Sequence, residues 1–235
     1  MLELFQHPFF HPFGSGGAAP LAEPVLDWRV YLLLAGAILV AATIHEWGHA
    51  CTADLLGDKL PRKEGRLRLN PFVHFDPLGG LLMLATLLLN LPVGWGKAVR
   101  TNPDNYRCGK RLGTALVALG GPAANLLLAV LLSSVVRLIL DGAFGRGPLA
   151  AWLFLGLCIA VLINLSLFVF NLVPVPPLDG AHVVASLLPP RLGTVFRDVM
   201  KQVGPVILLG LVASGWMAET LAPFVLKLFR LLIGI

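Results

Sequence analysis

Long apolar runs, separated by short polar or basic segments, constrain this chain more than any other feature of its sequence. Three of them, residues 30–44, 112–140 and 149–172, contain at most one charged side chain each. A bilayer core is about 30 Å thick, and a helix of about 20 apolar residues crosses it while satisfying its own backbone groups. The sequence therefore predicts an all-α polytopic membrane protein with a three-helix core.

The composition supports this fold class. Of the 235 residues, 57% are hydrophobic and only 13% are charged, whereas a soluble domain carries roughly 25% charged residues. The net charge of +5 comes from basic residues that flank the apolar runs, and no basic run with interleaved aromatic residues is present. We therefore expect the lipid bilayer, and no nucleic acid, among the partners.

The charges of the connecting segments predict how the chain is organised. Basic residues gather in the segments on either side of the run 78–91, which the positive-inside rule places in the cytoplasm. This run is short for a span, so it predicts a re-entrant segment, and the alternation in Arg66–Leu69 predicts a short β-strand. We expect an irregular segment 1–27, a core 28–202, and a C-terminal membrane segment 203–235 of one span or two.

The pentapeptide His45-Glu46-Trp47-Gly48-His49 lies near the end of the first apolar helix. Its spacing puts two imidazoles on one helix face, with a carboxylate beside them. Such groups in hydrocarbon cost several kcal/mol unless they are paired or bind a metal. The pattern predicts a zinc site with His45 and His49 as ligands and Glu46 as general base. The alternative is a chance match on a helix whose polar residues satisfy one another.

Two further polar residues are candidates for the same site. Catalytic zinc needs a third protein ligand, and the loop charges place Asp179 at the membrane depth of His49; the alternative is an ordinary turn where the helix leaves the membrane. Asn125 lies within the second long run, after a Gly-Gly-Pro sequence that allows close helix approach. Its carboxamide is suited either to hold a substrate backbone or to make an interhelical hydrogen bond.

Three motifs in this order resemble the site-2 protease family of intramembrane zinc metalloproteases. They are His45-Glu46-x-x-His49, Gly121-Pro122-x-x-Asn125, and Asn171 followed by Pro177-Leu178-Asp179-Gly180. The segment from Leu69 to Gly79 resembles the compact bacterial and archaeal members, which lack a PDZ domain.

The resemblance implies one Zn²⁺ per chain, bound by His45, His49 and Asp179, with Glu46 activating a water molecule. It also implies that Asn125 contacts the substrate backbone and that the expected strand offers its edge to an unwound substrate.

The substrate implied is a single-span membrane protein, or a remnant signal peptide, cleaved within or near its transmembrane segment. The active site would lie toward the cytoplasmic side of a bacterial or archaeal cell membrane. Asn171 and His74 are candidates to support the metal ligands through hydrogen bonds.

Two other classes remain open. A membrane zinc transporter should carry ionisable residues at several depths of the bilayer. A non-proteolytic scaffold stabilised by a metal would not need Glu46.

Overall fold

The computed structural model describes residues 28–74, 97–142 and 147–234. These residues form helices and no β-strand. Three long helices, α2 (Trp28–Leu55), α6 (Lys110–Leu140) and α7 (Pro148–Asn171), are each long and apolar enough to cross a membrane. The prediction of a helical chain with three long apolar core helices, each a candidate span, is confirmed for this part. The segments 1–27 and 78–91, for which we predicted irregular and re-entrant structure, lie outside the described residues.

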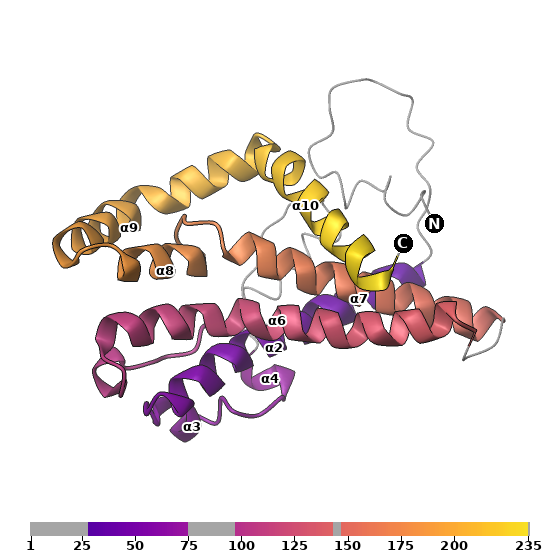
Figure 1. Ribbon diagram of the computed structural model, residues 1–235, viewed down its shortest axis with the longest axis horizontal. Coiled ribbons are helices and arrows are strands. Elements are labelled where there is room, and N and C mark those ends of the chain that lie inside the picture. Colours follow the sequence, from indigo (N-terminus) through magenta and orange to yellow (C-terminus); the bar gives the residue numbers. More distant parts are fainter. Residues whose placement is uncertain (1–27, 75–96, 143–146, 235) are drawn as a thin grey trace.

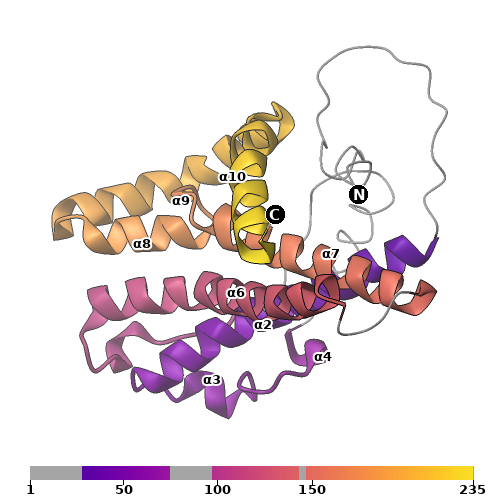
Figure 2. The same cartoon turned by 45° about the vertical axis from the view of Figure 1, so that its right-hand side comes forward.

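The other elements lie on two sides of this core (Figures 1 and 2). They are α3 (Leu60–Lys63), α4 (Pro71–His74), the 3₁₀ helix η1 (Pro103–Asn105), α8 (Asp179–Leu187), α9 (Pro190–Ala213) and α10 (Trp216–Ile233). Helices α3 and α4 pack against α2, whereas α8 packs against α6 and α10 packs against α7 and α6. Helix α6 is therefore central, because it contacts α2, α7 and α8.

Glycines allow α2 and α6 to approach closely. A Cβ atom at Gly48 would lie 2.4 Å from the carbonyl oxygen of Gly120, and one at Gly120 would lie 2.4 Å from the hydroxyl of Thr52. Small residues at a helix contact let two membrane helices pack backbone against backbone. This close contact brings side chains of α2 within reach of groups on α6.

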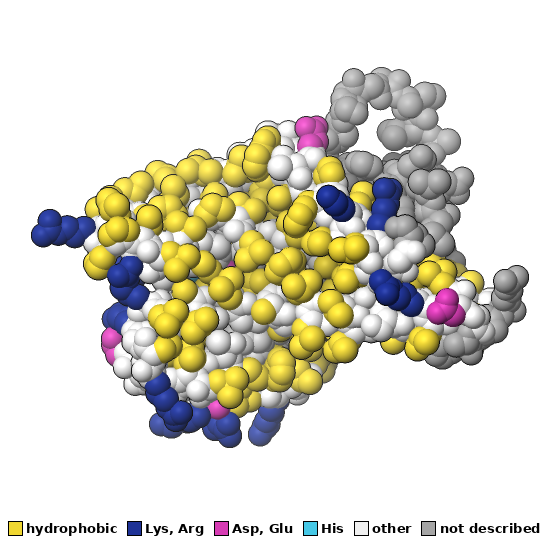
Figure 3. Space-filling model, viewed as in Figure 1, with side chains coloured by type: hydrophobic (Ala, Val, Ile, Leu, Met, Phe, Trp, Pro, Cys, Tyr) yellow, Lys and Arg dark blue, Asp and Glu magenta, His cyan; other side chains and the backbone are white. Residues whose placement is uncertain are grey.

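A second packing centre joins α6, α7 and α10. Its buried side chains include Val136, Leu162, Leu165 and Phe229. The helices also carry many exposed large hydrophobic side chains. In Figure 3 hydrophobic side chains cover the middle of the visible face, and lysine and arginine side chains lie toward its edges. An apolar surface of this extent is expected of helices that face lipid.

Residues 64–67 form turns, followed by a bend at residue 68, so the prediction of a strand at Arg66–Leu69 is wrong. The N–H of Arg66 donates to the carbonyl of Pro61 at 2.9 Å, and the N–H of Arg68 donates to the carbonyl of Gly65. Gly65 has a φ of +73°, which a glycine adopts without steric cost. These local bonds use the donors that a β-ladder would need. The Arg66 side chain, which an alternating strand could expose, is buried and bonds to main-chain carbonyl groups.

The C-terminal region contains two helices rather than one tilted span. Helices α9 and α10 meet at a break after Ala213 and are bent by 73°. Gly215 has a φ of +76° at this break. Together the two helices are long and apolar enough to form a fourth, interrupted span. The domain boundary predicted at residue 203 falls within α9.

Candidate metal centre

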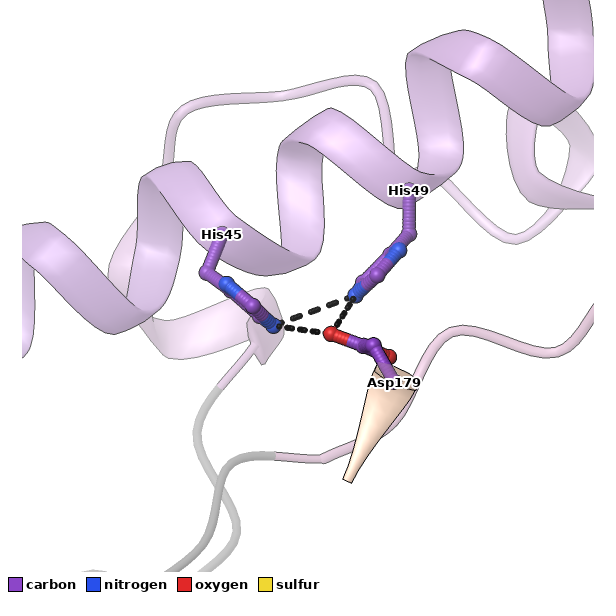
Figure 4. A group of neighbouring side chains, drawn as sticks. All are labelled: His45, His49 and Asp179. Atoms are coloured by element: carbon purple, nitrogen blue, oxygen red, sulfur yellow. Dashed lines mark hydrogen bonds and ion pairs between the residues drawn. The ribbon is translucent and has the colours of Figure 1, made fainter. Parts of the chain in front are cut away.

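Two histidines of α2 and one aspartate of α8 meet at a single point (Figure 4). The Nε2 atoms of His45 and His49 lie 3.1 and 3.3 Å from Oδ2 of Asp179, and 3.1 Å from each other. All three side chains are largely buried. Asp179 begins α8, directly after the proline-rich segment that follows α7. The structure thus brings together the three residues that the sequence predicted as metal ligands.

The other ring nitrogen of each histidine is already engaged. Nδ1 of His45 lies 2.7 Å from Oδ1 of Asn125, and Nδ1 of His49 lies 2.7 Å from the carbonyl oxygen of Val117. A carbonyl oxygen can only accept a hydrogen bond, so in each neutral ring Nδ1 carries the proton. The N–H of Gly121 also points at Nδ1 of His49, but at 3.3 Å this contact is longer than the 2.7 Å contact with Val117, which therefore decides the tautomer. Both Nε2 lone pairs are therefore directed at the Asp179 carboxylate, and three acceptor atoms face one another.

Such an arrangement fits a bound cation. Two imidazole nitrogens and one carboxylate oxygen form a common donor set for catalytic zinc. Ligand atoms about 2.0–2.1 Å from a tetrahedral zinc lie roughly 3.3 Å apart, close to the separations of His45, His49 and Asp179. Oδ2 of Asp179 is buried and has no hydrogen-bond donor among the described residues. The residues therefore fit Zn²⁺, with one position left for water or substrate.

Helix α6 provides the space for both histidine rings. A Cβ atom at Gly121 would lie 2.4 Å from Nε2 of His49 and 2.9 Å from Cε1 of His45. The next residue, Pro122, lies inside the helix and has no N–H to donate, so the helical hydrogen bonding is interrupted beside the histidines. The Gly-Pro pair of the sequence motif thus lies against the candidate metal ligands.

Glu46 is held by a main-chain group from a distant part of the chain. Its Oε2 accepts a hydrogen bond of 3.0 Å from the N–H of Val99. The residues that follow Val99 are held by the fully buried carboxylate of Asp58, which accepts hydrogen bonds from the N–H of Asn102 and the side chain of Asn105. The contact at Val99 could not be predicted from the sequence, since the donor is a backbone group that any residue except proline supplies.

Asn125 is completely buried between the three core helices. Besides accepting from His45, its amide donates to the carbonyl of Ala41 on α2 and to Oδ1 of Asn164 on α7. The interhelical hydrogen bond considered for Asn125 therefore exists. Its contact with a substrate stays a prediction, and it would require one of these bonds to be released.

Asn171 and His74 make other contacts. The amide of Asn171 donates to the carbonyl of Leu167 on its own helix. Nε2 of His74 donates to the carbonyl of Arg68, and its main-chain carbonyl accepts from Lys97. These hydrogen bonds hold the polypeptide around α4 and the end of α7. Support of the metal ligands by either residue stays a prediction.

The fold and this site describe a zinc metalloprotease built on membrane helices, and comparison with known proteins agrees. A family model described as Peptidase family M50 matches residues 143–211. One relative is YwhC of Bacillus subtilis (strain 168), whose name describes it provisionally as a zinc metalloprotease. It is 38% identical to this chain over 168 residues, which cover 70% of this chain and 72% of YwhC.

Rip2 of Mycobacterium tuberculosis (strain H37Rv), named in the same way, is 33% identical over 178 residues. The match covers 74% of this chain and 64% of Rip2, so it spans just under two thirds of that relative. Comparison with solved structures gave no match. The chain belongs to peptidase family M50, the site-2 protease family, and is a zinc metalloprotease of that family.

Proposed function

We propose that this chain is an intramembrane protease that hydrolyses peptide bonds within or near the transmembrane segments of membrane proteins. The observation that carries this proposal is the convergence of His45, His49 and Asp179 beside Glu46, within a bundle of candidate spans. Membership of family M50 supports the same reaction class.

Each residue of the site has its own role in the proposed hydrolysis. A Zn²⁺ ion at this site would polarise a scissile carbonyl and lower the pKa of a water molecule toward about 7. His45 and His49 keep their protons on Nδ1 and so leave Nε2 free to act as ligand, while Asp179 contributes negative charge. Glu46 is the base that takes a proton from the attacking water and passes it to the leaving amine. The hydrogen bond from Val99 orients the Glu46 carboxylate for this role.

The expected substrate is a single-span membrane protein or a remnant signal peptide. Its helix must unwind before cleavage, because a helical carbonyl is shielded by its own hydrogen bond. Substrates should therefore carry helix-weakening residues near the cut, and Asn125 is the candidate to contact the unwound backbone. The basic residues of 59–68 lie just after the helix end that carries the site, which supports an active site near the cytoplasmic face.

A membrane zinc transporter fits these observations less well. Transport needs metal-binding groups at successive depths across the bilayer. In the described part of the chain, the histidine, cysteine and acidic side chains form one such group, composed of His45, His49 and Asp179. A single site with a carboxylate base beside it favours hydrolysis.

The test compares three properties of the full chain purified in detergent: zinc content, cleavage of a single-span substrate, and cleavage of a soluble peptide. Glu46→Gln should retain zinc and lose cleavage, whereas His49→Ala and Asp179→Ala should lose both. Glu219→Gln, the same change on the exposed face of α10, should behave as wild type. Full cleavage by Glu46→Gln, or equal cleavage of the soluble peptide, would contradict the proposal.

A further inference from the structure

A continuous chain of hydrogen bonds crosses the bundle from α7 through α6 to His45 on α2. The side-chain amide of Asn164 donates to the carbonyl of Ala160 at 2.8 Å. Oδ1 of Asn164 accepts from the amide of Asn125 at 2.8 Å, and that amide also donates to the carbonyl of Ala41 at 2.9 Å. Oδ1 of Asn125 lies 2.7 Å from Nδ1 of His45. The two asparagine residues are 0% and 1% exposed.

Two main-chain carbonyl groups fix the direction of every bond in this chain. The carbonyl of Ala160 can only accept, so the amide nitrogen of Asn164 must face it and the oxygen must face Asn125. The carbonyl of Ala41 imposes the same condition on Asn125, whose oxygen must then face His45. His45 consequently has to donate from Nδ1, and its Nε2 lone pair has to face the metal centre.

We infer that Asn164 is a positioning residue that orients His45 for metal binding by holding the Asn125 carboxamide. The inference rests on the metal site of the proposed function. Asn125 has two N–H groups, and Asn164 is the acceptor for one of them. Without that acceptor a buried N–H is left unsatisfied, which favours rotation of the Asn125 carboxamide away from His45. The imidazole then loses the partner that sets its ring orientation and the position of its proton.

A purely structural role for Asn164 predicts something different. An interhelical hydrogen bond that only joins α6 and α7 would change the melting temperature of the protein. It would leave the affinity for zinc and the electronic spectrum of a metal bound at His45 unchanged. Metal affinity and spectrum therefore separate the two roles.

The experiment uses the full chain in detergent with Glu46→Gln present, so that protease activity plays no part. Zinc affinity is measured by chelator competition, and the visible spectrum of the Co²⁺-substituted protein reports on ligand geometry. Asn164→Leu should lower zinc affinity about tenfold and alter the cobalt spectrum. Asn164→Asp, neutral when buried, keeps an oxygen facing Asn125 and should retain wild-type values. The melting temperature of the metal-free protein shows whether each variant folds. If Asn164→Leu does not fold, Asn164→Ala takes its place in the same measurements.

A control variant and a double variant test whether Asn164 affects zinc affinity through Asn125. Ser133→Ala removes another buried polar group of the bundle, whose hydroxyl donates to its own helix, and should leave zinc affinity unchanged. If Asn164 acts through Asn125, adding Asn164→Leu to Asn125→Leu should cause no further loss.

Folded Asn164→Leu protein with wild-type zinc affinity and cobalt spectrum would overturn the inference. Additive losses in the double variant would overturn the route through Asn125. Unchanged zinc affinity in His45→Ala would overturn the metal site itself, and the inference with it. Because every variant carries Glu46→Gln, zinc affinity and the cobalt spectrum test the positioning role of Asn164 separately from the proposed hydrolysis.

Discussion

Gly121 on α6 gives the sharpest test of how the bundle accommodates its metal ligands. Replacing it with alanine adds one methyl group, which the structure places 2.4 Å from Nε2 and 2.6 Å from Cε1 of His49, and 2.9 Å from Cε1 of His45. Ordinary contacts of a Cβ atom begin at 3.4 Å. The His49 ring, the helix, or both must therefore move by about 1 Å.

The displaced atom is Nε2 of His49, the candidate metal-ligand atom of that residue. His49 cannot turn aside freely, because its Nδ1–H donates to the carbonyl of Val117. Overpacking of this kind typically costs about 1–3 kcal/mol, and a displacement of 1 Å at a catalytic group can cost about 10²-fold in rate. We expect Gly121→Ala to lower kcat/KM about 100-fold and to weaken zinc binding.

The assay is cleavage of a single-span substrate in liposomes, together with zinc affinity measured by chelator competition. Gly36→Ala is the matched control, since it adds the same methyl group to α2 where nothing lies within 4 Å. That variant should keep wild-type zinc affinity and activity, and its helix should be slightly more stable. Wild-type zinc affinity and cleavage in Gly121→Ala would refute the packing argument.

Three further predictions concern groups that hold the fold around the site together. Asp58→Ala removes the acceptor of at least two hydrogen bonds and should lower the free energy of unfolding by about 2 kcal/mol or more in denaturant titration. In Gly204→Leu the new Cβ atom would lie about 3 Å from Pro176, and the variant should reduce cleavage by disturbing the segment before α8. In Gly210→Leu nothing lies within 4 Å of the new Cβ atom, and cleavage should be unchanged. Arg137→Leu removes two hydrogen bonds to the carbonyl groups at the end of α10 and should increase proteolysis of α10 without loss of zinc; unchanged proteolysis would contradict that role.

The sequence predicted the helical core well because membrane helices carry a strong local signal. A run of about 20 apolar residues has few alternatives in a bilayer, since each helix satisfies its own backbone. The predicted runs 112–140 and 149–172 differ from the ends of α6 and α7 by no more than two residues. The short strand at Arg66–Leu69 was wrong because alternation over four residues is a weak pattern, and local turn bonds with a glycine at φ +73° outweighed it.

The candidate site was likewise predicted only in part from the sequence. The i, i+4 spacing of His45 and His49 is local, so the sequence determined that the two rings share a face of α2. Loop charges indicated the depth of Asp179, but only packing could bring its carboxylate within 3.1 Å of His45. Packing alone also brings Asn164 of α7 to the Asn125 carboxamide of α6.

The chain by itself thus determined the class of membrane protein, the long helices and the chemical identity of the candidate ligands, because each follows from composition or from spacing along one helix. The tertiary structure alone decided which nitrogen of each histidine faces the centre, which backbone N–H holds Glu46, and why Gly121 has room for no side chain. These properties depend on contacts between helices far apart in the sequence, where a displacement of 1 Å changes the outcome and no local pattern records it.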